Sequence, residues 1–179
     1  MRISAGSTMG ELTFITGPVR SGKSQRAVEL ATCWGSDTVF VATYQTDVHD
    51  SEMMERVRCH RAQRPAWRTL EAPVDVAARL AALAPPPSGV ILDCLTLWAG
   101  ARFAESDQAI ATAWSVQLSE FKAASWPTVV VSNELGWGLV PAEPQARRFR
   151  DLAGTLAQLT SAVADNVWLM IAGCPLRLK

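Results

Sequence analysis

The sequence predicts a single α/β domain, a three-layer sandwich in which helices cover both faces of a mostly parallel central sheet. Segments with strand-like and helix-like patterns alternate along almost the whole chain, which is typical of such sandwiches. The chain has 179 residues, close to the size of one domain. Because 49% of the residues are hydrophobic, the chain can build a core without disulfide or metal staples. We expect residues 1–10 to form a flexible N-terminal extension and residues 11–179 to form the domain.

The alternation begins with a strand, a glycine turn and a helix. Residues 11–16, ELTFIT, form a β-rich run that stops at Gly17, and residues 22–34 follow with apolar residues at helical spacing. Residues 38–43, TVFVAT, form a second apolar run of strand length. This order predicts a strand–helix–strand unit.

The middle of the chain is predicted to contain a helix, a short strand and a second helix. Residues 51–64 are rich in helix-forming Glu, Met and Arg, with Ser51 as a candidate N-cap and Pro65 as the helix end. We expect a short strand at residues 67–70 and a helix at residues 74–83. The segment PPPSG that follows predicts a rigid turn.

The strongest strand candidate opens the second half of the chain. Residues 90–93, VILD, form an apolar run that ends in a carboxylate, as expected of a central parallel strand whose carboxyl end faces a ligand. Helices are expected at residues 108–124 and 145–164, on either side of an apolar strand at residues 128–132. Residues 167–172 supply one more strand.

Charge and cysteine content exclude several classes of protein. Seventeen Lys and Arg balance seventeen Asp and Glu, so no overall positive field would attract nucleic acid or an anionic membrane. The four cysteines form no C-x-x-C pair and there are two histidines, which does not make a zinc site or a disulfide framework. No apolar run has the length of a membrane span, and the first ten residues lack the apolar stretch of a secretion signal. We expect a cytoplasmic protein.

A phosphate-binding loop is the clearest motif of the sequence. Residues 17–24, GPVRSGKS, match the Walker A pattern G-x-x-x-x-G-K-[ST] and lie between the first expected strand and helix, the context this motif requires. Backbone N–H groups there can surround a phosphate, Lys23 can reach the β- and γ-phosphate oxygens, and Ser24 can ligate Mg²⁺. The alternative is a tight glycine turn; Arg20 could add charge to the site or point to solvent. The motif predicts a P-loop NTPase-like fold.

Asp93 is the second candidate of the phosphate site. It ends the VILD strand, and adjacent parallel strands end at the same crevice, so its carboxylate is placed to position Mg²⁺ or nucleotide. A strand-end acid that caps the next helix is the alternative. We interpret Cys94, next to it, as a small core residue.

His60 lies in an arginine-rich segment of the expected helix at residues 51–64. Arg56 and Arg64 lie four residues before and after it and share its helix face, and Arg61 is adjacent. Nearby cations disfavour the imidazolium form and would keep a neutral, nucleophilic ring, while the arginines could hold phosphate oxygens. An exposed arginine-rich face with an incidental histidine is the alternative. We interpret His49 as a surface residue.

The sequence does not decide the role of two further clusters of polar residues. Asn133 and Glu134 follow a predicted strand, where either a site loop or a simple turn fits. Arg147, Arg148 and Arg150 begin the last predicted helix, where phosphate binding and simple exposure fit equally well. The seven tryptophans are spread along the chain, and we expect them to pack in the core.

The order of the motifs along the chain resembles a known family. The segments GPVRSGKS, FVAT, ERVRCHRAQRP, WRTLE, ILDCLTLW, VSNELGWGLVP, ARRFRDLAG and VWLMIAGCPLRLK follow one another between residues 11 and 179. Together they resemble the bifunctional adenosylcobinamide kinase / adenosylcobinamide-phosphate guanylyltransferase family of cobalamin biosynthesis.

The resemblance implies a two-step enzyme. It would phosphorylate the aminopropanol hydroxyl of adenosylcobinamide with ATP or GTP, with Mg²⁺ as cofactor, and then transfer GMP from GTP to give adenosylcobinamide-GDP. The family's covalent guanylyl histidine falls on His60, and its typical assembly is a homotrimer. Its nucleotide contacts fall on Gly17, Pro18, Val19, Arg20, Ser21, Gly22, Lys23, Ser24, Ala42, Thr43, Tyr44, Arg61, Ala62, Gln63, Arg64, Glu71 and Asp93.

Some details and alternatives stay open at this point. A carboxylate such as Glu71 could accept both N1–H and N2–H of guanine, but the sequence does not decide which acid reads the base. The segment YQTDVHD is about two residues longer, and RPAWRT one shorter, than is usual in the family. The alternative functions are a Mg²⁺-dependent P-loop kinase of another small-molecule alcohol and, without an N-K-x-D base-reading motif, a GTP-binding regulatory module.

Overall fold

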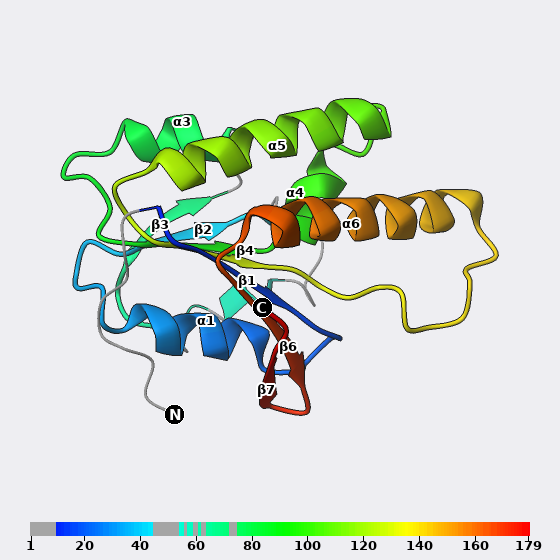
Figure 1. The fold of residues 1–179 in the computed structure, drawn as a ribbon, viewed down its shortest axis with the longest axis horizontal. Coiled ribbons are helices and arrows are strands. Elements are labelled where there is room, and N and C mark those ends of the chain that lie inside the picture. Colours follow the sequence, from blue (N-terminus) through cyan, green and yellow to red (C-terminus); the bar gives the residue numbers. More distant parts are fainter. Residues whose placement is uncertain (1–9, 45–53, 56, 59–60, 62–63, 72–74) are drawn as a thin grey trace.

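A mostly parallel sheet lies at the centre of the computed structural model, which describes residues 10–44, 54–55, 57–58, 61, 64–71 and 75–179 (Figure 1). The described part has seven strands in the order β3-β2-β4-β5-β1-β6-β7. β1 to β6 are mutually parallel, and β7 is antiparallel to β6. The strands are β1 (Leu12–Thr16), β2 (Val39–Ala42), β3 (Arg68–Glu71), β4 (Val90–Asp93), β5 (Thr128–Val131), β6 (Asn166–Ile171) and β7 (Cys174–Arg177).

Helices cover both faces of this sheet, so the predicted three-layer α/β sandwich is confirmed (Figure 1). One face carries α1, and the other carries α3, α4, α5 and α6. The helices are α1 (Lys23–Ala31), α3 (Val76–Ala81), α4 (Leu95–Ala101), α5 (Asp107–Ala123) and α6 (Pro144–Val163). No described helix is long and apolar enough to cross a membrane.

The central strands are apolar because both of their faces are buried. In β1, Leu12 and Phe14 pack with the helices of the four-helix face, whereas Ile15 packs on the α1 face. In β4, Leu92 faces the first of these cores and Ile91 the second. This alternation is the two-residue period of a strand, and it explains why the runs read as continuous apolar segments in the sequence.

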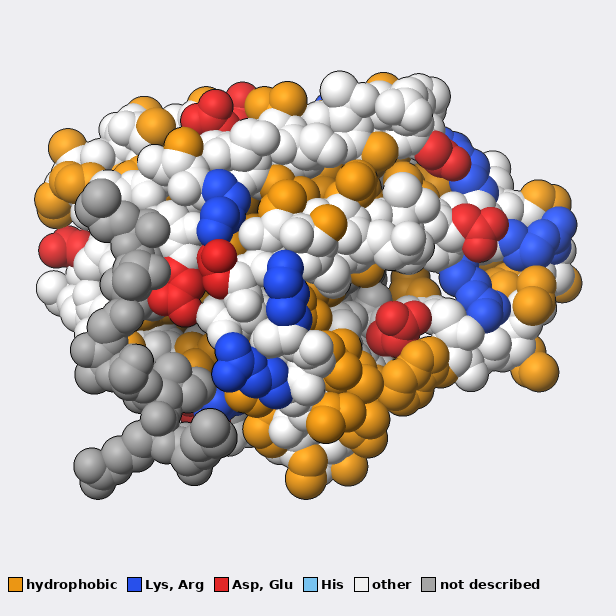
Figure 2. All heavy atoms as spheres, viewed as in Figure 1, with side chains coloured by type: hydrophobic (Ala, Val, Ile, Leu, Met, Phe, Trp, Pro, Cys, Tyr) orange, Lys and Arg blue, Asp and Glu red, His pale blue; other side chains and the backbone are white. Residues whose placement is uncertain are grey.

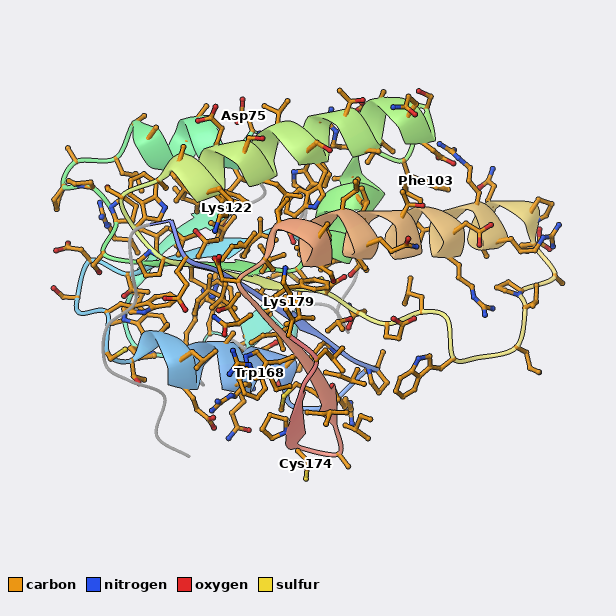
Figure 3. The ribbon with its side chains drawn as sticks, viewed as in Figure 1. Asp75, Phe103, Lys122, Trp168, Cys174 and Lys179 are labelled. Atoms are coloured by element: carbon orange, nitrogen blue, oxygen red, sulfur yellow. The ribbon has the colours of Figure 1, made fainter. Side chains whose placement is uncertain are left out.

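Tryptophans occupy both core and surface positions. Trp98 and Trp114 are buried, with ring centroids 4.9 Å apart, and the Trp114 indole N–H donates to Thr160 Oγ1 at 2.9 Å. Trp168 lies beside α1, and Arg26 and Arg177 place guanidinium groups 5.6 and 5.8 Å from its ring centre (Figure 3). The expectation of core packing is therefore confirmed for the first two of these rings but is wrong for Trp137, which is 60% exposed.

Two elements of the structure have no counterpart among the predicted ones. α4 follows β4 almost directly, and its buried residues Leu95, Thr96, Trp98 and Ala99 leave no clear polar stripe that would mark a helix. In β7 all four residues are exposed and one is Pro175, so the strand lacks both alternation and burial. The predicted helix at residues 51–64 lies largely outside the described residues.

Candidate functional site

The carboxyl ends of the parallel strands bring residues of three segments together. Ala42, the last residue of β2, is paired with Glu71 at the end of β3 and with Asp93 at the end of β4. β1 ends at the same edge and leads into the phosphate-binding loop at residues 17–24. Because ligands of parallel α/β sheets bind at this edge, the structure assembles a candidate nucleotide site here.

The phosphate-binding loop lies between β1 and α1 and is fixed from two sides. The backbone N–H of Gly173 donates to Ser21 O at 3.0 Å, and that of Glu134 donates to Gly17 O at 2.9 Å. A Cβ on Gly17 would lie 2.3 Å from Met170 O, so this position accepts glycine alone without a shift. Arg20 is exposed and has a positive φ of 57°. The loop is therefore anchored at its start and middle before any ligand binds.

Lys23 is buried at the start of α1. It is 7% exposed, and its Nζ donates to Pro18 O at 2.7 Å within the loop. Burial lowers the pKa of Lys23, while the negative charge of Asp93 acts to raise it. Ser21 is 3% exposed, and its Oγ has no partner within the described residues. A phosphate oxygen in the loop would satisfy both groups, which is the chemistry a phosphate-binding loop requires.

Asp93 is half-buried at the end of β4, close enough to Lys23 and Arg64 to affect both electrostatically. Together with Ser24 in the first turn of α1, it offers oxygen ligands of the kind Mg²⁺ prefers. Among the described residues no three His, Cys, Asp or Glu side chains cluster as a metal site. One serine hydroxyl and one carboxylate are the kind of donors that Mg²⁺ uses together with phosphate oxygens and water.

Thr43 and Cys94, the residues that follow β2 and β4, link the ends of these two strands by hydrogen bonds. The buried Thr43 hydroxyl donates to Cys94 O at 2.7 Å and accepts from Cys94 N at 2.8 Å. Thr43 N also donates to Asp93 O at 3.3 Å. Burial, and then the charge of Asp93, raise the pKa of Cys94 to about 11. The thiol therefore stays neutral, and the interpretation of Cys94 as a core residue is confirmed.

An arginine pair lies on the β2–β3 side of the site. Arg61 forms an exposed ion pair with Glu71. The Arg64 guanidinium lies 3.8 Å from the ring centre of Phe40 and donates to Thr69 Oγ1 at 3.1 Å. Burial, and then Arg61, lower the pKa of Arg64, while Asp93 acts to raise it. The site thus brings two guanidinium groups and two carboxylates to one edge.

Several predicted site residues lie outside the described residues, and others make no contact that decides a role. His60, Ala62 and Gln63 belong to the first group, together with Arg56 and His49. Pro18 and Tyr44 are half-buried and Val19 is exposed; Pro18 contributes its carbonyl to Lys23. The individual nucleotide contacts of these residues stay predictions.

The segment after β5 is more highly organised than its sequence predicts. Asn133 Nδ2 donates to Thr96 Oγ1 at 3.0 Å, which links this segment to α4. Arg150 donates to the carbonyls of Gly136 and Leu139. Arg147 likewise donates to the carbonyls of residues 141 and 142.

Arg148, from the same basic cluster, contacts a different part of the molecule. It pairs with Asp107 and lies over the Phe103 ring, which is beside α6 (Figure 3). The three arginines at the start of α6 are thus engaged in holding loops. A run of arginines in the first turns of a helix does not reveal such carbonyl partners, so the sequence alone does not decide their role.

Comparisons with known proteins agree with this geometry. The family model described as cobinamide kinase / cobinamide phosphate guanyltransferase matches residues 13–178. The chain belongs to this family. Its phosphate-binding loop, Asp93 and the segment after β5 all lie within the matched residues, so the resemblance inferred from the motifs is confirmed.

Relatives of this cobinamide kinase / guanyltransferase chain are similar over nearly their full length. The bifunctional adenosylcobalamin biosynthesis protein CobP of Pseudomonas aeruginosa is 38% identical over 167 residues, which cover 92% of this chain and 95% of the relative. The CobU proteins of Salmonella typhimurium and Escherichia coli are each 32% identical over 183 residues, 94% of this chain and 99% of the relative. The chain is therefore an enzyme of the kinase and guanylyltransferase class.

Proposed function

We propose that this enzyme phosphorylates the aminopropanol hydroxyl of adenosylcobinamide with ATP or GTP, and then transfers GMP from GTP to the product to give adenosylcobinamide-GDP. The observation that carries the proposal is a complete phosphate-binding loop beside Asp93 in a chain of the cobinamide kinase / guanyltransferase family. Both reactions use a nucleoside triphosphate, so one loop can serve both.

The loop residues would bind the triphosphate through their backbone and through two side chains. Ser21 and Lys23 hold polar groups that a phosphate could satisfy, because one is unpartnered within the described residues and the other is bonded to a loop carbonyl. The remaining loop contacts proposed for nucleotide are those of Gly17, Pro18, Val19, Arg20, Gly22 and Ser24. Lys23 would release Pro18 O when it binds phosphate.

Ser24 and Asp93 are the residues we propose to hold Mg²⁺. A bound Mg²⁺ would neutralise charge on the β- and γ-phosphate oxygens. Asp93 also lies near Lys23, so its carboxylate helps to keep that buried ammonium protonated. Lys23 and Asp93 therefore carry opposite charges at the phosphate end of the site, whether or not the metal is bound.

We further propose His60 as the nucleophile that carries GMP between GTP and the phosphorylated acceptor. Two arginines that follow His60 in the sequence support this: Arg64 lies close enough to Asp93 to interact with it electrostatically, and Arg61 pairs with Glu71 at the end of β3. Such guanidinium groups would keep the imidazole neutral and hold phosphate oxygens. The imidazole nitrogen would bond to the α-phosphorus as pyrophosphate leaves, and an acceptor phosphate oxygen would then displace it.

The β2–β3 side would bind the nucleoside. Ala42 ends β2 and is followed by Thr43 and Tyr44, and Glu71 ends the neighbouring strand. Glu71 is our candidate for guanine recognition, because a carboxylate can accept both N1–H and N2–H. Its ion pair with Arg61 is 53% exposed on both sides, so the base could displace the arginine at small cost.

The assembly and domain limits remain part of the proposal. We propose a homotrimer, on the basis of the family resemblance, with residues 11–179 as the folded unit and residues 1–10 as an extension. The mass of the purified protein in solution, measured by light scattering, tests the trimer directly.

Product analysis tests the proposed function. The enzyme should convert adenosylcobinamide and GTP with Mg²⁺ into adenosylcobinamide phosphate and adenosylcobinamide-GDP, resolved by chromatography and mass spectrometry. Other small alcohols should yield no phosphorylated product. If adenosylcobinamide is inert while another alcohol is phosphorylated, the protein is a P-loop kinase with a different acceptor.

A further inference from the structure

Glu134 is a carboxylate beside the phosphate-binding loop to which neither the sequence motif nor the proposed nucleotide contacts give a role. It follows β5, which lies between β4, the strand that ends in Asp93, and β1, the strand that leads into the loop. Its backbone N–H donates to Gly17 O at 2.9 Å. Its main chain is therefore fixed to the first residue of the loop, on the side of the site opposite the β2–β3 edge.

A hydrogen bond to its own loop holds the Glu134 side chain in place. Its Oε1 accepts from Gly136 N at 2.7 Å, and the residue is half-buried. None of the ion pairs found among the described residues involves Glu134. A carboxylate with one neutral hydrogen bond and access to solvent keeps lone pairs with which to accept another proton.

The other acids at this edge are engaged. Glu71 is paired with Arg61. Asp93 interacts with Lys23 and Arg64 and is the residue we propose for Mg²⁺. Phosphorylation of an alcohol releases a proton, and kinases use a carboxylate near the phosphate site to accept it. Among the described residues at this edge, Glu134 is the carboxylate left for that task.

The loop that begins at Glu134 also displays an apolar surface. Trp137 is 60% and Leu139 95% exposed, yet Arg150 fixes the backbone by donating to the carbonyls of Gly136 and Leu139. Figure 2 shows apolar side chains at the far end of this loop and over the β6–β7 hairpin. Exposed apolar surfaces of this kind can receive a bulky organic ligand, as the proposed acceptor is.

We propose that Glu134 is the general base of the kinase reaction, an inference that rests on the proposed function above. The acceptor hydroxyl oxygen bonds to the γ-phosphorus, the bond from γ-phosphorus to the β–γ bridging oxygen breaks, and the nucleoside diphosphate leaves with that electron pair. The hydroxyl proton passes to the Glu134 carboxylate and then to solvent. Guanylyl transfer does not need this base, because its acceptor is a phosphate oxygen that is already ionised.

The decisive variant is Glu134→Gln, which keeps an oxygen to accept from Gly136 N but cannot take up the proton. We expect its kinase kcat to fall by about 10²-fold or more, the usual contribution of a general base. Its KM for nucleotide should change by less than about threefold, because the triphosphate contacts remain. Guanylyl transfer to supplied adenosylcobinamide phosphate should stay near the wild-type rate. Glu143→Gln is the matched control: Glu143 is an exposed acid at the N-cap of α6 whose side chain makes no capping hydrogen bond. This variant should leave both activities intact.

The other outcomes overturn the inference in distinguishable ways. If Glu134→Gln retains kinase activity, Glu134 only closes the turn to Gly136. If both activities fall together, Glu134 supports the phosphate-binding loop in general and is not a base. Glu134→Ala, followed by thermal unfolding, separates this loss from misfolding. If the wild-type enzyme phosphorylates no corrinoid at all, the proposed function fails before Glu134 is tested.

Discussion

The two halves of the site are built in different ways. At the phosphate end, backbone groups are tied to one another or to buried side chains, as in Gly173 N to Ser21 O and Lys23 Nζ to Pro18 O. On the β2–β3 side, the contacts join long, mostly exposed side chains, as in the pair of Arg61 and Glu71. Backbone hydrogen bonds fix positions before a ligand arrives, whereas exposed ion pairs are weak and easily exchanged.

The two halves should therefore differ in how well they tolerate substitutions. A phosphate has the same shape in every nucleotide, so a fixed cradle suits it. The β2–β3 side must exchange partners between a base and arginines, and it carries the segments whose lengths depart from the family pattern, YQTDVHD and RPAWRT. Substitutions at the phosphate end should therefore have larger effects than those on the β2–β3 side.

The largest effect on the two reactions together is expected for Lys23→Ala. Both reactions need the triphosphate held in the loop, so kinase and guanylyltransferase rates should each fall by on the order of 10²–10³-fold. The fold should persist, because Lys23 contributes a single hydrogen bond to Pro18 O. Steady-state rates and circular dichroism of the same preparation check both parts. Unchanged GTP turnover in a folded variant would remove the phosphate-loop assignment.

Asp93→Asn should have the next largest effect on activity. It removes the charge that we propose to hold Mg²⁺ and that supports protonation of Lys23, so both rates should drop by about 10²-fold. Thermal stability should change little, because the residue is half-buried and the amide keeps its shape. A large loss of stability with normal turnover would instead assign Asp93 a structural role.

Thr43→Val compared with Glu71→Gln tests, through stability, the difference between a buried contact to the backbone and an exposed ion pair. The first change leaves the buried Cys94 N–H without its hydrogen-bond acceptor and should lower the free energy of unfolding by about 1–3 kcal/mol. The second removes an exposed ion pair and should cost less than about 1 kcal/mol. Denaturant unfolding of both variants measures the two values. Equal values would contradict the expectation that buried contacts to the backbone stabilise this edge more than exposed ion pairs do.

Cys94 gives a smaller, pH-dependent effect. Its pKa is raised from 9.0 to about 11, so the folded state holds the thiol proton more tightly than the unfolded chain does. The resulting stabilisation is complete below about pH 9 and is lost as the pH rises toward 11. Unfolding of wild type and Cys94→Ala between about pH 8 and pH 10 should show the difference shrinking with pH. At the lower pH, iodoacetamide should label the exposed Cys33 and Cys174 but spare Cys94.

The sequence predicts the phosphate end of the site well because its requirements are local. A glycine loop between a strand and a helix, and an acid at the end of VILD, follow from short patterns whose chemistry is specific. The order of strands and helices is predicted for a similar reason: buried parallel strands are apolar throughout, and amphipathic helices such as α6 have a clear period.

The rest depends on contacts between distant segments. The bond of Thr43 to Cys94 spans 51 positions, and nothing in either local pattern marks it. Thr43 stays a predicted nucleotide contact, and the sequence gives no sign that its hydroxyl bonds to the backbone of Cys94. Arg147 and Arg150 likewise resemble any basic helix start until their carbonyl partners are seen. β7 escapes prediction because its side chains are exposed and its partner β6 alone defines it.

Covalent labelling tests the central claim, that one phosphate-binding loop serves two chemistries and His60 carries GMP in the second. Wild-type enzyme incubated with Mg²⁺ and GTP should retain label from the α-phosphate but not from the γ-phosphate on denaturing gels. The bond should be labile to acid and stable to alkali, as a phosphoramidate is. His60→Ala should lose this label and guanylyl transfer while keeping kinase activity, and His49→Ala should keep all three. Retention of label by His60→Ala, or its appearance on Cys59 or Lys23, would contradict the account.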